Sequence, residues 1–289
     1  MTHRIVPVIT PFRANRVDTQ KLVHHSRKLL EDGMDYVFVA GTTGLGVSLS
    51  TDEKLLMLEE LREFSQKLMI QVGSLDLQES INLAEQAKRL DLHAIVSYPP
   101  YFYPRMQDDW VVKHLTTLSK IYPMIVYNYP LATGYDITPA IVKKVRQNGG
   151  NVIGIKDTIS DLAHMLSFKY ELGNDFIVYS GPDTIVTSAV RSGLDGCVAG
   201  SANYVPELLV KATDLGAKLS EAIAAQRTIT ALANLAKKYG QWAANYPLVK
   251  TIREYDVGEP RAPIYPLSQT DEEKLSAEAR EIYPLMKAK

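Results

Sequence analysis

The amino-acid sequence predicts an α/β fold: a (β/α)8 barrel of the TIM type with a C-terminal helical extension. Eight short apolar runs recur along residues 1–205, segments of helical character separate them, and the strand signals then stop. A helix that joins two parallel strands forms a βαβ unit, and eight such units close a barrel. No GxGxxG motif follows the first run, which disfavours a doubly wound sheet that binds a dinucleotide.

The predicted strands are short and often β-branched, as parallel strands covered on both faces usually are. They comprise residues 5–10, 36–40, 69–73, 94–98, 124–129, 152–157, 176–181 and 196–200.

Helical patterns fill the gaps between these strands, and the clearest spans residues 48–68. Ser50 followed by Glu53 makes a capping box there. Apolar residues then recur with a 3.6-residue period at Leu55, Leu58, Leu61, Phe64 and Leu68. Residues 78–90, 108–120 and 136–147 carry three further helical patterns. We therefore expect a barrel in residues 1–205 and a helical extension packed on it in residues 206–289.

The charge balance and cysteine count exclude several classes of protein. The 289 residues include 32 basic and 33 acidic side chains, so we expect no nucleic-acid partner. The one cysteine, Cys197, excludes an internal disulfide and fits a reducing compartment. The sequence shows neither a secretory signal nor an apolar stretch of membrane-spanning length. We expect a cytoplasmic protein without a membrane partner.

Lys156 stands at the end of an otherwise mostly apolar strand pattern. In a barrel of this kind, polar residues at the carboxyl ends of the strands form the active site. Burial disfavours an ammonium ion, so a lysine there can attack a ketone as a free amine and form a Schiff base. The alternative is an ion pair with the adjacent Asp157, although neighbours along a strand point to opposite faces.

Other strand ends carry further polar candidates. Tyr127 and Tyr129 are two residues apart and face one side of their strand, where they either meet the lysine or simply fill a barrel layer. Thr42 and Thr43, in the loop GTTGLG, offer hydroxyl and backbone N–H groups to a carboxylate, although such a loop can also be a plain turn. The histidines show no ligand spacing, so we expect no metal site.

Four motifs together resemble the dihydrodipicolinate synthase and N-acetylneuraminate lyase superfamily of class I aldolases. They are TPF at 10–12 with VD at 17–18, GTTG at 41–44, YNYP at 127–130 and GIKDT at 154–158. The resemblance implies that Lys156 forms an imine with pyruvate or another 2-keto acid, so that no external cofactor is required. It also implies that Tyr127 is the acid/base residue and that Thr42 and Thr43 bind the substrate carboxylate.

Within this superfamily the sequence is similar to the archaeal 2-keto-3-deoxygluconate aldolases. Leu45 stands where the synthases and sialic acid lyases usually carry glutamate. Ala132 stands where dihydrodipicolinate synthases keep an arginine, and a site without that arginine is poorly suited to an anionic amino-aldehyde. The resemblance implies reversible cleavage of 2-keto-3-deoxygluconate to pyruvate and glyceraldehyde. We expect its 6-phosphate to be cleaved as well, giving glyceraldehyde 3-phosphate, without a large advantage.

The same resemblance assigns the residues around the sugar. The expected pocket residues are Tyr129, Thr158, Gly181 and Ala199, and the expected cations near a phosphate are Arg105 and Lys237. Phe102 is a departure, because relatives carry at this position a tyrosine that reaches the neighbouring subunit's site. A homotetramer and a place in carbohydrate metabolism of the Entner–Doudoroff type are also implied.

Two alternatives remain open from the sequence. The chain could act on another 2-keto acid, as an N-acetylneuraminate lyase or a dihydrodipicolinate synthase does. It could also be a pyruvate sensor without catalysis, because a fold does not determine a function.

Overall fold

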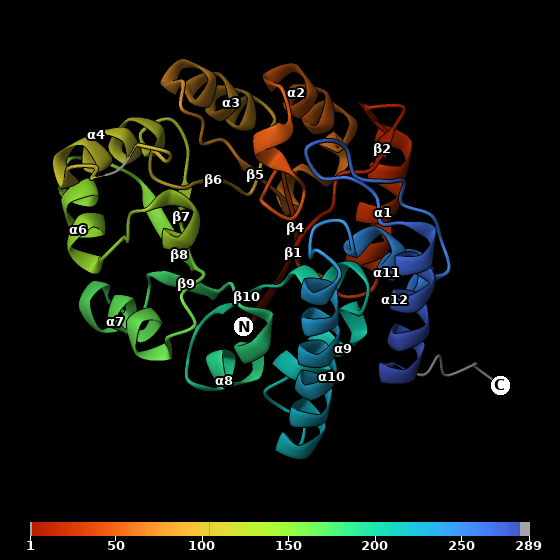
Figure 1. Ribbon diagram of the computed structural model, residues 1–289. Coiled ribbons are helices and arrows are strands. Elements are labelled where there is room, and N and C mark those ends of the chain that lie inside the picture. The colour runs from red at the N-terminus through yellow and green to blue at the C-terminus, as the bar shows by residue number, and fades with distance from the viewer. Residues whose placement is uncertain (1, 104, 284–289) are drawn as a thin grey trace.

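The computed structural model describes residues 2–103 and 105–283, and among them eight parallel strands close into a barrel (Figure 1). In barrel order they are β1 (His3–Pro7), β4 (Tyr36–Val39), β5 (Leu68–Gln71), β6 (Ala94–Ser97), β7 (Met124–Asn128), β8 (Val152–Asp157), β9 (Ile177–Ser180) and β10 (Gly196–Val198). The predicted fold class and all eight strands are confirmed, with ends that differ from the prediction by three residues at most.

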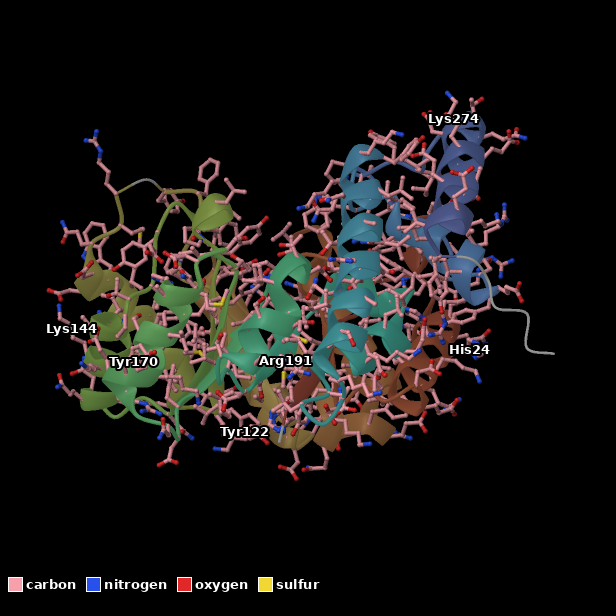
Figure 2. The ribbon with its side chains drawn as sticks, turned by 90° about the horizontal axis from the view of Figure 1, so that it is seen from below. His24, Tyr122, Lys144, Tyr170, Arg191 and Lys274 are labelled. Carbon is pink, nitrogen blue, oxygen red and sulfur yellow. The ribbon has the colours of Figure 1, made fainter. Side chains whose placement is uncertain are left out.

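Helices follow the strands and surround the barrel (Figure 1). They are α1 (Thr19–Glu31), α2 (Thr51–Glu60), α3 (Leu77–Arg89), α4 (Asp108–Ser119), α6 (Pro139–Gln147), α7 (Leu162–Leu172), α8 (Val186–Arg191) and α9 (Pro206–Thr213). Their polar faces point to solvent, as Lys144 of α6 and His24 of α1 do at opposite edges of the molecule (Figure 2).

The capping box is confirmed, but the helix it begins is shorter than predicted. The Ser50 hydroxyl accepts a hydrogen bond from the Glu53 backbone at 3.2 Å, and the Glu53 carboxylate accepts one from the Ser50 backbone at 2.9 Å. The α-helix ends at Glu60 and a 3₁₀ helix, η2 (Arg62–Lys67), follows it. The prediction of a helix to Leu68 is wrong, because Leu68 is buried in β5 beside Val37. A single apolar residue at this position fits both the 3.6-residue period of a helix and the two-residue period of a strand, so the pattern does not show where the helix ends.

One hairpin has no counterpart in the sequence analysis. Strands β2 (Phe12–Arg13) and β3 (Arg16–Val17) pair antiparallel outside the barrel. The two residues between them, Ala14 and Asn15, have φ of 48° and 63°. Positive φ at both central positions is the geometry of a tight hairpin turn, which glycine or asparagine usually signals. Alanine at the first position hides that signal.

Side chains fill the barrel lumen below the carboxyl ends of the strands. Its buried cluster contains Ile5, Phe38, Met69, Ala94, Val96, Tyr98, Ile125, Tyr127, Tyr179 and Val198. A second and larger apolar cluster lies between the strands and the helices. The lumen is therefore a packed core, and an apolar floor lies under any polar group at the carboxyl ends of the strands.

Three more helices follow the ring and lie together on one side of the barrel (Figure 1). They are α10 (Leu219–Lys238), α11 (Asn245–Arg253) and α12 (Gln269–Ile282), and α10 contacts both α9 and α12. Because α9 also contacts β1, it links the extension to the barrel. The boundary between barrel and helical extension at residue 205 stays a prediction. Residues 284–289, the end of the extension, lie outside the part of the chain that the structure describes. None of the helices described could cross a membrane.

Candidate active site

A cavity of about 290 Å³ opens at the carboxyl ends of the barrel strands. Most of the residues that the sequence analysis selected line it: Thr42, Thr43, Tyr127, Tyr129, Lys156, Thr158, Gly181 and Lys237. The structure therefore brings together residues that are up to 195 positions apart in the chain, from 42 to 237.

Lys156 and Tyr127 form the centre of the cavity. They are paired residues of the neighbouring strands β8 and β7, and both are almost fully buried. The Lys156 amine, Nζ, lies 3.9 Å from the centre of the Tyr127 ring and 5.5 Å from that of Phe38. Beneath the amine, the lumen walls are apolar side chains such as Ile125 and Val198. Asp157 turns to the outer side of β8, so the lysine does not pair with it.

The loop after β4 brings Thr42 to this centre. The Thr42 hydroxyl lies 3.2 Å from the Tyr127 hydroxyl. The loop folds tightly, because the Gly46 backbone donates to the Gly41 carbonyl at 2.9 Å. A Cβ atom at Gly46 would lie 1.6 Å from the Ala40 carbonyl oxygen, so only glycine fits there.

The same loop has backbone donors that the protein itself leaves unused, two of them in residues that line the cavity. Thr10 fixes it from below, since the Thr10 hydroxyl donates to the Gly44 carbonyl at 2.6 Å. In the part of the chain that the structure describes, the backbone N–H groups of Thr42, Thr43 and Gly44 have no acceptor in the protein. Free N–H groups beside two threonine hydroxyls make a suitable site for a carboxylate.

Tyr129, Thr158 and Gly181 form the wall beside the lysine. The Tyr129 ring stacks on that of Tyr127 with centroids 5.9 Å apart. Burial raises the pKa of the Tyr129 hydroxyl, and the nearby Tyr127 adds to the effect, so this phenol stays a hydrogen-bond donor at neutral pH. Thr158 donates through its hydroxyl to the Asn128 carbonyl at 2.9 Å.

Comparison with known families agrees with this arrangement. A model of the dihydrodipicolinate synthetase family matches residues 1–282. The chain belongs to the dihydrodipicolinate synthetase family.

Relatives within the family are named as aldolases of 2-keto-3-deoxy sugar acids. The 2-dehydro-3-deoxy-phosphogluconate/2-dehydro-3-deoxy-6-phosphogalactonate aldolase of Sulfurisphaera tokodaii is 39% identical, with 98% of this chain and 97% of the relative covered. The 2-dehydro-3-deoxy-D-gluconate/2-dehydro-3-deoxy-phosphogluconate aldolase of Thermoproteus tenax is 37% identical, with 94% and 89% covered. A structure of the Sulfolobus solfataricus 2-keto-3-deoxygluconate aldolase in complex with D-KDPG is 39% identical, has a TM-score of 0.92, and covers 97% of this chain and 96% of its own.

Three residues that the family resemblance singled out do not line the cavity. Ala199 is buried in the apolar cluster outside the lumen, whereas its neighbours Val198 and Gly200 reach the cavity. Arg105 lies in the loop after β6, with an exposed side chain and φ of 60°. Phe102, in the same loop, is 80% exposed. Among the residues of this loop that the structure describes, 101–103 and 105–107, none therefore adds a cation or a phenol to the cavity.

The helical extension closes one side of the cavity, which the sequence analysis did not predict beyond Lys237. Ala233 and Ala236 of α10 and Trp242 and Asn245 after it line the space. A helical period shows that α10 has an apolar face but not which part of the barrel that face covers.

Asp183 is a further lining residue, and it accepts hydrogen bonds from the Ser201 backbone at 2.9 Å and the Ser201 hydroxyl at 2.5 Å. The motif SGPD at residues 180–183, a polar stretch where β9 ends, is the feature of the sequence that indicates Asp183.

Proposed function

We propose that the chain is a class I aldolase that reversibly cleaves 2-keto-3-deoxygluconate to pyruvate and glyceraldehyde. The observation that carries the proposal is the contact of the buried Lys156 amine with the Tyr127 ring, 3.9 Å from its centre, beside a threonine loop suited to a carboxylate. The family and the relatives named as aldolases support it.

The first step joins the substrate to the lysine. The amine of Lys156 attacks the C2 carbonyl of the 2-keto acid, the departing hydroxyl group takes the phenolic proton of Tyr127 and leaves as water, and a protonated imine forms. Thr42, Thr43 and their backbone N–H groups hold the neighbouring C1 carboxylate and so fix C2 above the amine. The apolar floor below Lys156 keeps water away from the underside of the attacking amine.

The second step breaks the C3–C4 bond. The Tyr127 oxygen takes the proton of the C4 hydroxyl, directly or through the substrate carboxylate, and C4 leaves as the aldehyde carbonyl. The electron pair of the broken bond moves to the imine and forms an enamine, which makes a metal ion unnecessary. Tyr127 returns this proton to C3 of the enamine, and water then hydrolyses the imine, which releases pyruvate and restores both Lys156 and the Tyr127 hydroxyl.

The rest of the substrate extends from C3 toward the other residues that line the cavity. Tyr129, Thr158, Gly181 and Lys237 all line the cavity. In our proposal the first three face the central carbons of the substrate, and Lys237 of α10 meets the 6-phosphate. An ammonium ion offers phosphate a hydrated point charge and not the bidentate fork of arginine. The 6-phosphate is therefore cleaved without a large advantage in kcat/KM. A phosphate contact of Arg105 stays a prediction, which Arg105→Ala tests by a selective loss for the 6-phosphate.

The assembly and location follow the family resemblance. We place the enzyme in the cytoplasm as a homotetramer. The exposed aromatic rings of Phe102 and Tyr103, 80% and 58% accessible, suit a subunit contact beside the cavity. Light scattering on the purified protein gives the mass of the assembly, and a monomeric mass at micromolar concentration contradicts the proposal.

A cleavage assay tests the function. The purified protein is offered 2-keto-3-deoxygluconate, its 6-phosphate, N-acetylneuraminate and other 2-keto acids, and pyruvate release is followed by reduction to lactate. The highest kcat/KM is expected for the first two. Preference for N-acetylneuraminate identifies a different lyase of the family, and pyruvate binding without any cleavage identifies a sensor.

A further inference from the structure

The residues that follow Tyr127 and Lys156 along their strands also contact each other. Tyr127 pairs with Lys156, and Asn128 pairs with Asp157 one step further. Side chains alternate along a strand, so the first pair faces the lumen and the second faces outward. The Asn128 amide donates to the Asp157 carboxylate at 3.2 Å, and both side chains are fully buried. This outer pair fixes the strand register in which the inner pair meets.

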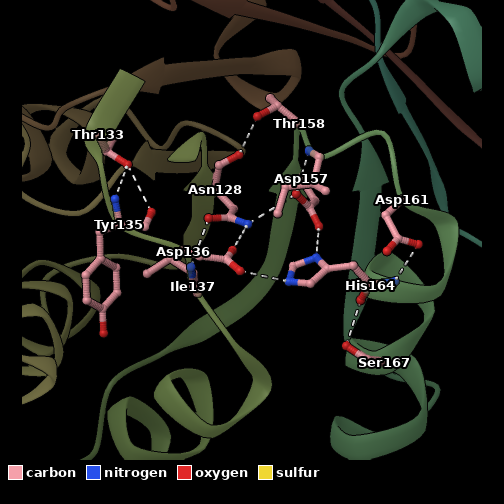
Figure 3. A network of polar contacts seen from close by, with 11 residues as sticks. Asn128, Thr133, Tyr135, Asp136, Ile137, Asp157, Thr158, Asp161, His164 and Ser167 are labelled. Carbon is pink, nitrogen blue, oxygen red and sulfur yellow. Dashed lines mark hydrogen bonds and ion pairs between the residues drawn. The ribbon is translucent and has the colours of Figure 1, made fainter. Parts of the chain in front are cut away.

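His164 of α7 holds the outer pair from the helix side (Figure 3). Its Nδ1 lies 2.6 Å from one Asp157 oxygen, and its Nε2 lies 3.4 Å from an Asp136 oxygen. Asp136 also accepts from the Asn128 amide at 2.8 Å. The imidazole thus lies between two carboxylates, one from β8 and one from the segment between α5 (Pro130–Thr133) and α6. Only Nδ1 forms a hydrogen bond, because the geometry at Nε2 allows none to the described residues.

Asp157 depends on this partner more than Asp136 does. Burial raises the pKa of the Asp157 carboxyl, while hydrogen bonds from the Ile159 backbone, His164 and Asn128 counteract the rise. The Asp136 side chain is 44% exposed and can exchange a lost partner for water. An interaction lost on the Nδ1 side therefore leaves a buried acceptor unpaired, whereas a loss on the Nε2 side does not.

The network is also tied to the cavity wall. The Asn128 carbonyl accepts from both the backbone and the hydroxyl of Thr158, at 3.1 and 2.9 Å. The Asp157 carbonyl accepts from the Gly181 backbone at 2.7 Å. A shift of Asp157 or Asn128 therefore moves Thr158 and Gly181 together with Lys156.

We infer that His164 is a positioning residue, which holds Asp157 and Asn128 through Nδ1 so that Lys156 and Tyr127 keep their contact. It touches no substrate and transfers no proton to it. The inference rests on the proposed roles of Lys156 and Tyr127 and adds the side chain that maintains their alignment.

Two polar substitutions separate the two sides of the ring. In His164→Asn the amide nitrogen lies near the place of Nδ1 and can still donate to Asp157. In His164→Gln the amide reaches toward the place of Nε2 and leaves Asp157 without this donor. His114→Gln is the matched control, because His114 is an imidazole on the ring helix α4 whose buried Nε2 has no partner among the described residues.

The rate at which pyruvate becomes trapped on Lys156 by borohydride is measured for the wild type and the three variants, together with kcat and KM for 2-keto-3-deoxygluconate. His164→Gln is expected to lower the trapping rate and kcat by roughly 10–100-fold with KM changed less than about threefold, since misplacement of a reacting group acts mainly on kcat. His164→Asn should recover most of this loss, and His114→Gln should behave as the wild type.

Equal rates for the Asn and Gln variants, or a larger loss in the Asn variant, overturn the inference. So does a loss in His114→Gln as large as that in His164→Gln. A wild-type protein that traps pyruvate but cleaves no sugar acid contradicts the proposed function alone, because the trapping rates still test His164. If the wild-type protein does not trap pyruvate, both the proposed function and the inferred role of His164 are contradicted.

Discussion

At the scale of single residues, Tyr127 meets two neighbours through different parts of its side chain. Its hydroxyl lies 3.2 Å from the Thr42 hydroxyl, and the centre of its ring lies 3.9 Å from the Lys156 amine. The hydroxyl is thus placed for proton transfer, while the ring only packs against the amine. Removal of the oxygen should separate these two tasks.

Tyr127→Phe keeps the ring and removes the proton acceptor. We expect kcat for cleavage to fall by ~10²-fold or more, the low end of an acid/base contribution, while pyruvate is still trapped on Lys156. Steady-state kinetics and borohydride trapping on the same protein measure both quantities. Near-normal turnover in Tyr127→Phe would assign the proton transfer to Tyr129 or water.

Gly181→Ala tests how closely the wall is packed. A Cβ atom at Gly181 would lie 2.9 Å from the Asp157 carbonyl oxygen and 2.9 Å from the Thr158 methyl group. Overpacking of this kind costs about 1–3 kcal/mol, so the unfolding free energy in urea should fall by that amount. Gly200→Ala is the control, since its Cβ would meet nothing closer than 3.7 Å. Equal stability of the two variants contradicts the packing described.

At the scale of elements, α10 adds a second lysine to the cavity, beside Lys156 of the barrel. Lys237 lines the cavity, whereas its neighbour Lys238 points away and pairs with Glu278 of α12 at 2.7 Å. The two lysines are adjacent in sequence and differ in what they face. They form a natural pair for an experiment on phosphate recognition.

Lys237→Ala should lower kcat/KM for the 6-phosphate about five- to tenfold, because one partly screened charged contact is lost. The free sugar acid should change less than about twofold. Lys238→Ala should leave the ratio of the two kcat/KM values unchanged. Equal losses for both substrates in Lys237→Ala mean that Lys237 does not contact the phosphate.

The elements also show what the sequence could predict. Local signals were reliable where the pattern and the contact lie in one segment, as in the Ser50 capping box and the strand of Lys156. They failed at Leu68, where one apolar residue fits two periods, and at the hairpin turn of Ala14. The bridge from His164 to Asp157 and Asp136 joins a helix, a strand and a loop. Such contacts depend on how elements pack, which no spacing of histidines reveals.

At the scale of the whole molecule, buried neutral histidines link stability to pH. His25 of α1 is fully buried between Tyr255 and Asn203, with ring nitrogens 2.8 and 3.1 Å from their oxygens. Burial lowers the pKa of His25 to about 3, although the Asn203 hydrogen bond acts in the opposite direction. An unfolded histidine titrates near 6.5. The contribution of neutral His25 to the free energy of unfolding is therefore complete above pH ~6.5. It is lost as the pH falls from ~6.5 toward 3, because in this range the unfolded chain binds a proton that the folded protein does not.

His25→Gln should reduce the slope of the unfolding free energy against pH by about one proton, or ~1.4 kcal/mol per pH unit, between pH 6 and 4. Urea unfolding across this range measures the slope for the wild type and the variant. His24→Gln, which removes an exposed histidine from the same helix, should keep the wild-type slope. Identical slopes for His25→Gln and the wild type contradict a neutral buried His25.

The barrel, the threonine loop and the helical extension all converge on one amine, so the most direct measurement is the identity of the lysine that binds pyruvate. Borohydride added with pyruvate should inactivate the enzyme and add one reduced pyruvyl group per chain, which peptide mapping places on Lys156. Lys156→Ala should be neither labelled nor active, and borohydride alone should leave the wild type active. A label on another lysine, or turnover in Lys156→Ala, would contradict the Schiff-base mechanism.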